Sequence, residues 1–501
     1  FSALSAEIAS RFRSMLALAA SPSSDIQSIQ DELVLQQPIR RELYRQVIAL
    51  EPVVDEAMGE SSRLRYHSPE LQSALDGMLA AVSAWRMVAA RLWRLPVAAA
   101  RQEVAAVLLN LSPELRSAPQ QGEPNRWMGD PIGMQRVFGA AVATLIALPA
   151  GTPSLRLLAD QTARLLIGLS HALDGLALLV AEPARRRSLG RVRLRVPDWW
   201  PAFVNAGRAF VAISAAELFW IVTAWPNGAF AITFTAIVVI LLAPTADAAY
   251  AFAFRFAVGI VLGSVGAAIV EFAALPKVET FIGFSIVIGL YLIPIGALVA
   301  QPWQTPVFIA MTYNFVPLLA PANQMTYDTV QFYNFALAIG GGSIAGALSF
   351  RLLPPLSPAF RTRRLLMLTL RDLRRLATHP APPAREDWEG SIYGRLGALP
   401  DAAEPLQRAQ LLTALSVGSE IIELRRIAPQ LGPHSELDSA FAALAQGNST
   451  AATARLNEVD RRLASLPDSD PQTSLALRAR ALAICDSLAD HRAYFDTGAH
   501  S

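Results

Sequence analysis

The stretch RAFVAISAAELFWIVTAWPNGAFAITFTAIVVILLAP, residues 208–244, contains two long apolar segments separated by a short turn. The same alternation of apolar segments and short turns rich in Pro, Gly, Asn or Asp continues to Arg351. A helix that crosses a membrane needs roughly 20 mostly apolar residues, and several in succession would be hard to keep in water. We therefore predict six membrane-spanning helices, near residues 208–225, 228–244, 249–274, 280–300, 304–320 and 328–353.

The composition of the whole chain agrees with a partly membrane-embedded protein. Of 501 residues, 53% are hydrophobic and 17% are charged, whereas soluble chains carry about 25% charged residues. The mean hydropathy is +0.34. The net charge is +2, and the arginines lie beside the apolar segments, so we expect no nucleic-acid partner. A single cysteine, Cys485, excludes an intramolecular disulfide and a cysteine-based metal site.

The sequence on both sides of the apolar region is polar, amphipathic and without a strand pattern. We predict an all-α integral membrane protein: a transmembrane domain at 201–355, flanked by cytoplasmic helical bundles at 1–200 and 356–501. The apolar run 163–180 contains Arg164, His171 and Asp174. Charged residues are costly inside a span, so this run is predicted to be a buried helix of the first domain.

Arginine clusters border the apolar region at both ends. One cluster lies between residues 185 and 195, and the other runs from Arg351 to Arg375. Arginine close to a span marks the cytoplasmic side of a membrane, and an even number of spans returns the chain to the side it left. Both flanking domains are therefore predicted to be cytoplasmic.

Two ionisable residues within the apolar segments are candidates for function, because charges in spans are rare and usually functional. Glu217, midway along the first span, could carry a proton or be a structural carboxyl bonded to a neighbouring helix. Arg255, in the third span, could clamp an organic anion, reach to the interface, or pair with Asp247. Glu271 lies near the far end of the third span and is expected to be solvated.

Neutral polar residues at membrane depth form a second set of candidates, which includes Tyr291, Asn314 and Asn334. Such residues either contact a ligand or join one helix to another. Pro294 is expected to interrupt the fourth span. A span with an interrupted helix is a candidate for lining a transport pathway.

Glycines four residues apart occur in two of the predicted spans. The pairs are Gly259-x-x-x-Gly263, followed by Gly266, and Gly342-x-x-x-Gly346. Spacing of this kind predicts that helices approach each other closely.

Several motifs of other protein classes are missing from the sequence. The chain contains no nucleotide-binding G-x-x-x-x-G-K-[ST], no HExxH and no CxxC pattern. We therefore expect no enzyme activity, no cofactor and no metal site. Any transport would be driven by an ion gradient or would be passive.

The run AAELFWIVTAWPNG, residues 215–228, resembles the signature of the fusaric acid resistance family, which includes aromatic acid exporters. Residues 332–336, FYNFA, with the glycines at 340–346, resemble the sixth span of that family. The Trp225-Pro226-Asn227-Gly228 turn has its own physical sense, because Pro and Gly turn the chain while Trp lies at the interface.

The resemblance implies a bacterial inner-membrane efflux transporter for aromatic carboxylic acids or similar hydrophobic organic anions, coupled to protons. In that mechanism Arg255 would attract the carboxylate, Trp220 and Trp225 would contact the aromatic ring, and Glu217 would carry the proton. A periplasmic membrane-fusion partner is also implied, and a homo-oligomer is left open. Full-length members have two six-span halves. The chain begins at Phe1 without an initiator methionine, so we expect it to correspond to the second half and the region before it.

Two other functions are compatible with the same layout. A passive organic-anion channel is one, since a plant family of malate channels is similar in its six spans and helical tail. The other is a membrane-anchored scaffold whose cytoplasmic helices bind a partner.

Overall fold

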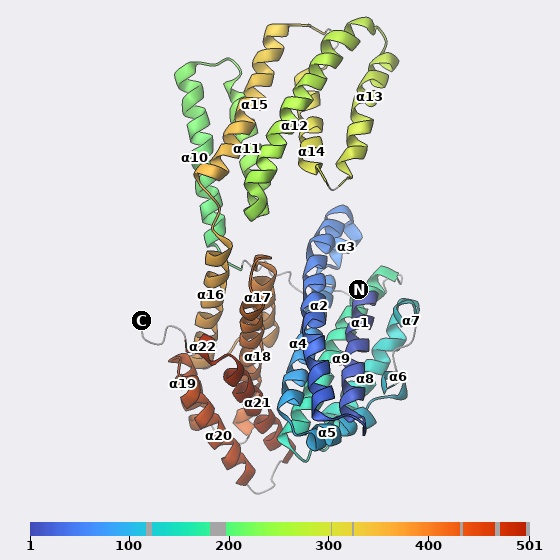
Figure 1. Ribbon diagram of the computed structural model, residues 1–501, viewed down its shortest axis with the longest axis vertical. Helices are drawn as coiled ribbons and strands as arrows, with labels where there is room; N and C mark the ends of the chain where they lie inside the picture. The colour runs from blue at the N-terminus through green and yellow to red at the C-terminus, as the bar shows by residue number, and fades with distance from the viewer. Residues whose placement is uncertain are drawn as a thin grey trace. The chain divides into compact units, whose positions relative to one another are not determined.

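The computed structural model describes residues 1–116, 123–180, 197–301, 303–322, 325–430, 434–465 and 471–496. These residues form helices and connecting segments, with no strand among them (Figure 1). The chain divides into two compact units. We call residues 198–361 the apolar unit, and residues 1–197 together with 362–501 the flanking unit. The arginine cluster at 185–195 lies outside the described residues.

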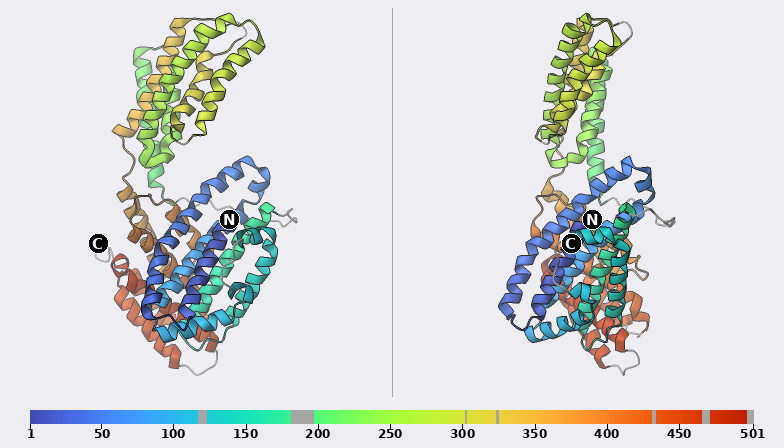
Figure 2. Two further views of the ribbon diagram at one scale, coloured as in Figure 1. Left: turned by 45° about the vertical axis from the view of Figure 1, so that its right-hand side comes forward. Right: turned by 90° about the vertical axis from the view of Figure 1, so that its right-hand side faces the viewer.

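The apolar unit has α-helices in all six of the ranges that the sequence predicts to be apolar spans. Successive helices run in opposite directions, so the unit's two ends lie at the same end of the group of helices (Figures 1 and 2). The helices are α10 (Trp200–Thr223), α11 (Gly228–Leu242), α12 (Ala249–Ile269), α13 (Phe281–Val299), α14 (Thr305–Leu319) and α15 (Thr329–Leu352).

Four of these helices are long and apolar enough to cross a membrane: α10, α12 with its continuation to Lys277, α13 and α15. The other two, α11 and α14, have 15 residues each. At 1.5 Å per residue they are about 22 Å long, which is shorter than the roughly 30 Å hydrocarbon core. A 3₁₀ segment, Ala243–Ala248, extends α11.

The break in helical winding occurs at a different place from the one that the sequence predicts. α13 continues through Pro294 to Val299, so the prediction of an interruption there is wrong. Neighbouring helices often compensate for proline in a membrane helix. The winding changes instead where α12 passes into a π-helical turn, Val270–Ala274, and then into a 3₁₀ turn, Leu275–Lys277.

The flanking unit is built from helices of both ends of the chain. Asp25 is the N-cap of its longest helix and forms a capping box with Ser28. From the N-terminal part it contains α1 (Ser2–Ala20), α2 (Ile26–Glu60), α3 (Ser62–Tyr66), α4 (Ser68–Arg94), α5 (Val97–Leu109), α6 (Pro113–Arg116), α7 (Glu123–Gly129), α8 (Pro131–Ala147) and α9 (Pro153–Val180). From the C-terminal part it contains α16 (Pro358–Thr378), α17 (Arg385–Gly397), α18 (Pro405–Ile427), α19 (His434–Ala445), α20 (Ser449–Ser465), α21 (Pro471–Asp490) and α22 (Arg492–Phe495).

One hydrophobic core joins the two parts of the flanking unit. It contains Trp85 and Leu169 from the N-terminal part and Leu415 and Ile484 from the C-terminal part. The apolar run 163–180 belongs to α9, which contributes buried residues to this core and is not among the helices suited to cross a membrane. Its prediction as a buried helix is confirmed.

Polar contacts reinforce the same junction. The guanidinium of Arg86 on α4 donates to the Leu412 carbonyl (2.9 Å) and to the hydroxyls of Thr413 (3.2 Å) and Ser416 (2.7 Å) on α18. Since hydrogen bonds that involve a charged group are stronger than neutral ones, these contacts fix α18 on α4.

Glu420 on α18 lies at the centre of a buried ion network. Its side chain is 1% exposed, and its carboxylate accepts from Arg164 Nη1 on α9 and Arg480 Nη1 on α21, each at 3.0 Å. Gln161 Nε2 donates to the same carboxylate at 3.1 Å. Burial alone would raise the pKa of Glu420, but Arg164, Arg480 and Arg385 outweigh it and hold the pKa at about 2.

We expect acid to weaken the flanking unit through this carboxylate. Because its folded-state pKa lies below the ordinary value of 4.5, the folded protein binds this proton more weakly than the unfolded protein. The stabilisation is therefore complete above the ordinary pKa and is lost as pH falls toward the folded value. Unfolding of wild type and Glu420→Gln, measured across acidic pH, should show that the difference between them shrinks as pH falls. A constant difference would contradict this role.

Candidate functional site

Glycines on one face of α12 let α14 and α13 approach it closely. A Cβ on Gly259 would lie 2.2 Å from the Val307 carbonyl oxygen of α14, and one on Gly263 would lie 3.0 Å from the Met311 Cα. The second glycine pair, Gly342 and Gly346, lies on α15 and allows α11 to approach. A Cβ on Gly346 would lie 2.7 Å from the Val238 Cβ of α11. Both glycine pairs therefore form close helix contacts, as their spacing predicts.

Asn314 forms a polar contact between α14 and α12. Its side chain is fully buried, and its Nδ2 donates to the Ile260 carbonyl (2.9 Å) and the Ser264 hydroxyl (2.8 Å). Its Oδ1 is buried and has no hydrogen-bond partner among the described residues. An unpaired buried acceptor is unfavourable, so this oxygen is available to a donor that enters the unit.

Tyr291 brings α13 onto the same face of α12. Its ring stacks on Phe315, the neighbour of Asn314, with centroids 3.9 Å apart and ring planes at 13°. A Cβ on Gly266 would lie 2.5 Å from the Tyr291 ring, so the glycine leaves room for the tyrosine. The Tyr291 hydroxyl is also buried without a partner among the described residues. The structure thus brings together two residues that the sequence singled out separately.

Glu271 is buried, whereas the sequence analysis expected it to be solvated. Its side chain is 5% exposed, it lies in the π-helical turn, and its Oε2 has no hydrogen-bond partner among the described residues. Phe272, the next residue, packs against Phe332 of α15, with ring centroids 5.2 Å apart. The apolar run continues past Glu271 to the buried Leu275. This continuation is the sequence signal that could have indicated that the carboxyl lies inside the group of helices.

Glu217 and Arg255 lie on exposed faces of α10 and α12. The side chain of Asp247, the alternative partner of Arg255, lies outside what the structure describes. Asn334 on α15 is half-buried. The structure does not gather these three residues into the group around Asn314 and Tyr291.

The two candidate tryptophans lie at the connection between α10 and α11: Trp220 in the last turn of α10, and Trp225 in the turn that follows. Ala224 ends α10 in the left-handed region, with φ of 48°. A Cβ on Gly228 would lie 1.9 Å from Trp220 Cδ1, so the indole covers the glycine directly. Trp225 packs edge-on against Phe219, with ring centroids 6.3 Å apart. The eight-residue spacing from Trp220 to Gly228 therefore has a structural reason: the indole packs directly on the glycine.

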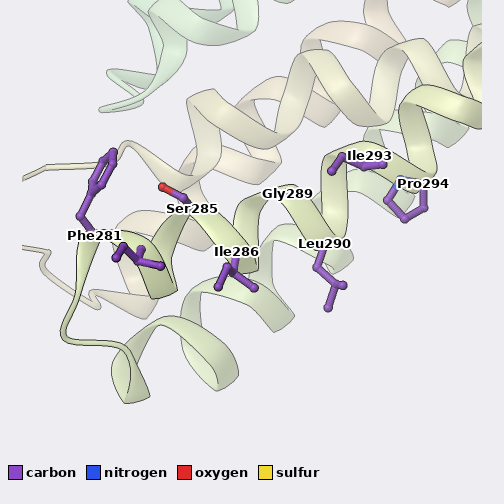
Figure 3. A pocket seen from close by; sticks show the side chains of 8 residues that line it. Phe281, Ser285, Ile286, Gly289, Leu290, Ile293 and Pro294 are labelled. Carbon is purple, nitrogen blue, oxygen red and sulfur yellow. The ribbon is translucent and has the colours of Figure 1, made fainter.

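A shallow hollow of about 560 Å³ follows the outward face of α13, from Phe281 to Pro294. The side chains along it are aliphatic or aromatic apart from Ser285 (Figure 3). Such a surface offers no charged group to hold an anion. Among the described residues, no group of three or more His, Cys, Asp or Glu side chains is placed to hold a metal ion.

Helices suited to cross a membrane, within a chain of this family profile, define a multi-pass membrane protein. The chain belongs to the fusaric acid resistance protein family, whose sequence profile matches residues 2–500. The recognition from the turn at 215–228 is confirmed.

One curated relative is an uncharacterized transporter of Gluconobacter oxydans, 34% identical over 182 residues. The match covers 36% of this chain and 24% of the relative, so the chain matches about a quarter of that protein's length. No solved structure matches the chain.

Proposed function

We propose that this chain is part of a proton-coupled exporter of aromatic carboxylic acids, or of similar hydrophobic organic anions, in a bacterial inner membrane. The observation that supports it best is the buried Asn314 of α14, which donates hydrogen bonds to α12 beside the stacked Tyr291 ring of α13, inside a unit of apolar helices. Polar groups in such surroundings are costly and mark substrate or ion pathways. Membership of a transporter family supports the same conclusion.

In this proposal all six helices of the apolar unit cross the membrane and both flanking segments are cytoplasmic, where they gate access. Arg255 attracts the carboxylate through its exposed guanidinium, since arginine matches carboxylate geometry. Trp220 and Trp225 contact the aromatic ring, and Glu217 carries a proton. A periplasmic membrane-fusion partner would continue the pathway, and the exporter would work as one copy or as a homo-oligomer.

We expect Glu217→Gln to abolish gradient-driven efflux while the protein still folds, because glutamine keeps the shape of the side chain but cannot release a proton. Benzoate transport into everted membrane vesicles, with and without a proton gradient, measures the effect. Glu279→Gln is the matched control, because Glu279 is exposed in the loop after α12. Wild-type efflux in Glu217→Gln would refute this role.

Electrical recording on the reconstituted protein distinguishes an exporter from a passive channel. A steady benzoate current across a reconstituted bilayer, without a proton gradient, would show that the protein is a channel and refute the exporter proposal. If cells kept the phenotype that depends on this protein after the apolar unit was removed, the scaffold role would be favoured over both the exporter and the channel.

A further inference from the structure

Glu271 is a lone buried carboxyl inside the apolar unit. The residue is only 5% exposed, and it makes no ion pair among the described residues. An ionised carboxylate without a partner is strongly unfavourable in apolar surroundings, so buried charges are normally paired or bound to a cation. The group therefore needs a proton or another cation.

The helices packed around the turn supply no cationic side chain near it. On α12 the charged residue is Arg255, close to the opposite end of the helix, and on α15 it is Arg351, also at the opposite end. The titratable groups that remain on α13, α14 and α15 are phenols: Tyr291, Tyr313 and Tyr333. None of these carries a positive charge.

The described residues of the loops at the same end of the unit do not supply a buried partner either. Lys277 and Glu279 follow the turn and are exposed. Asp328 accepts from the Val330 and Gln331 backbone amides, so it caps α15. With no cluster of metal-ligating groups among the described residues, a proton is the cation that suits the site.

The backbone at Glu271 is also unusual. Residues Val270–Ala274 form a π-helical turn between α12 and the 3₁₀ turn that ends it. π-helical turns are rare and occur often at functional sites, because the wider winding shifts side chains and frees backbone groups. Pro276, in the 3₁₀ turn that follows, lacks an N–H for the Phe272 carbonyl and crowds it, which gives the change in winding a local cause.

The turn lies toward the end of the unit that is opposite its chain ends (Figure 1). If the flanking segments are cytoplasmic, as proposed above, this is the periplasmic end, where protons enter in exchange for an exported anion. Glu271 lies six residues before Lys277, where the helical segment ends.

From these observations we infer that Glu271 is a proton-binding site of the apolar unit, distinct from Glu217, and that its protonation is coupled to anion export. The coupling role rests on the proposed exporter function. Proton binding itself does not, because it follows from the burial and isolation of the carboxyl.

Chemical labelling tests proton binding without any transport. N,N′-Dicyclohexylcarbodiimide is an apolar reagent that reacts with protonated carboxyls shielded from water. In membranes that contain the full chain, we expect it to label Glu271 at acidic pH and to lose reactivity as pH rises. The exposed Glu279 serves as an internal control in the same digest and should remain unlabelled. Absence of label on Glu271, or labelling that does not change with pH, would overturn the inference.

Proton flux tests the coupling. In proteoliposomes with a trapped pH dye, benzoate should drive proton movement by wild type and by Glu279→Gln. Glu271→Gln should lose it, and Glu271→Asp should restore part of it, whereas a merely structural role would be rescued by glutamine. Wild-type proton flux in Glu271→Gln would overturn the coupling role. If wild type itself moved no protons while Glu271 was still labelled with the expected pH dependence, the exporter proposal would fail and the proton site would stand.

Discussion

Replacing Glu420 by alanine should lower the free energy of unfolding of the flanking unit by about 3–5 kcal/mol, the usual result of breaking a buried ion pair from one side. Arg164 and Arg480 would remain 20% and 13% exposed without their shared carboxylate. The loss would also remove hydrogen bonds that join α9 to α18, because Gln161 and Arg164 both donate to Glu420. Denaturation of the full chain, followed by tryptophan fluorescence, to which the buried Trp85, Trp127 and Trp388 of this unit contribute, measures the change.

Glu458→Ala is the matched control for this variant. Glu458 also pairs with an arginine, Arg461 at 3.4 Å, but both side chains are about 70% exposed (69% and 74%). Exposed ion pairs contribute about 0–1 kcal/mol, so this change should have little effect. Equal losses in the two variants would mean that the network around Glu420 does not hold the unit together.

Gly342→Leu should prevent α15 from packing on α11 and should sharply reduce the yield of folded protein. A Cβ at this position would lie 2.2 Å from the Ala231 carbonyl oxygen and 2.9 Å from the Ala231 Cα, so the backbone itself must move. The same shift would break the 3.0 Å hydrogen bond from the buried Thr235 hydroxyl to the Gly342 carbonyl. Overpacking typically costs about 1–3 kcal/mol, and a clash with backbone lies at the high end.

Gly341→Leu is a close control, because a Cβ on Gly341 meets nothing within 4 Å. The two variants differ by one position and have the same composition. We expect the thermal midpoint of the Gly341 variant, measured in detergent by fluorescence-detected size-exclusion chromatography, to match wild type. The Gly342 variant should elute as aggregate or melt well below it. Similar behaviour of the two variants would contradict the close approach of α15 and α11.

The candidate residues separate into those that sequence reasoning could interpret and those that it could not. The glycine pairs were readable, because four-residue spacing puts two glycines on one helix face, whichever helix comes to meet it. Asn314 and Tyr291 were singled out as polar residues in apolar segments, but their convergence depends on how α13 and α14 pack on α12. Glu271 was misread, because its place near a helix end suggested contact with water.

By itself the sequence determined where the six apolar helices lie, and the turn at Trp225 and Gly228 was enough to recognise the family. Hydropathy and turn chemistry are local properties, so a single stretch of chain contains them in full. Only the tertiary structure decided that residues 1–197 and 362–501 share one core, and that Glu271 is buried with no hydrogen-bond partner for its Oε2 among the described residues. Both depend on contacts between segments far apart in the chain, and no local pattern specifies which faces will meet.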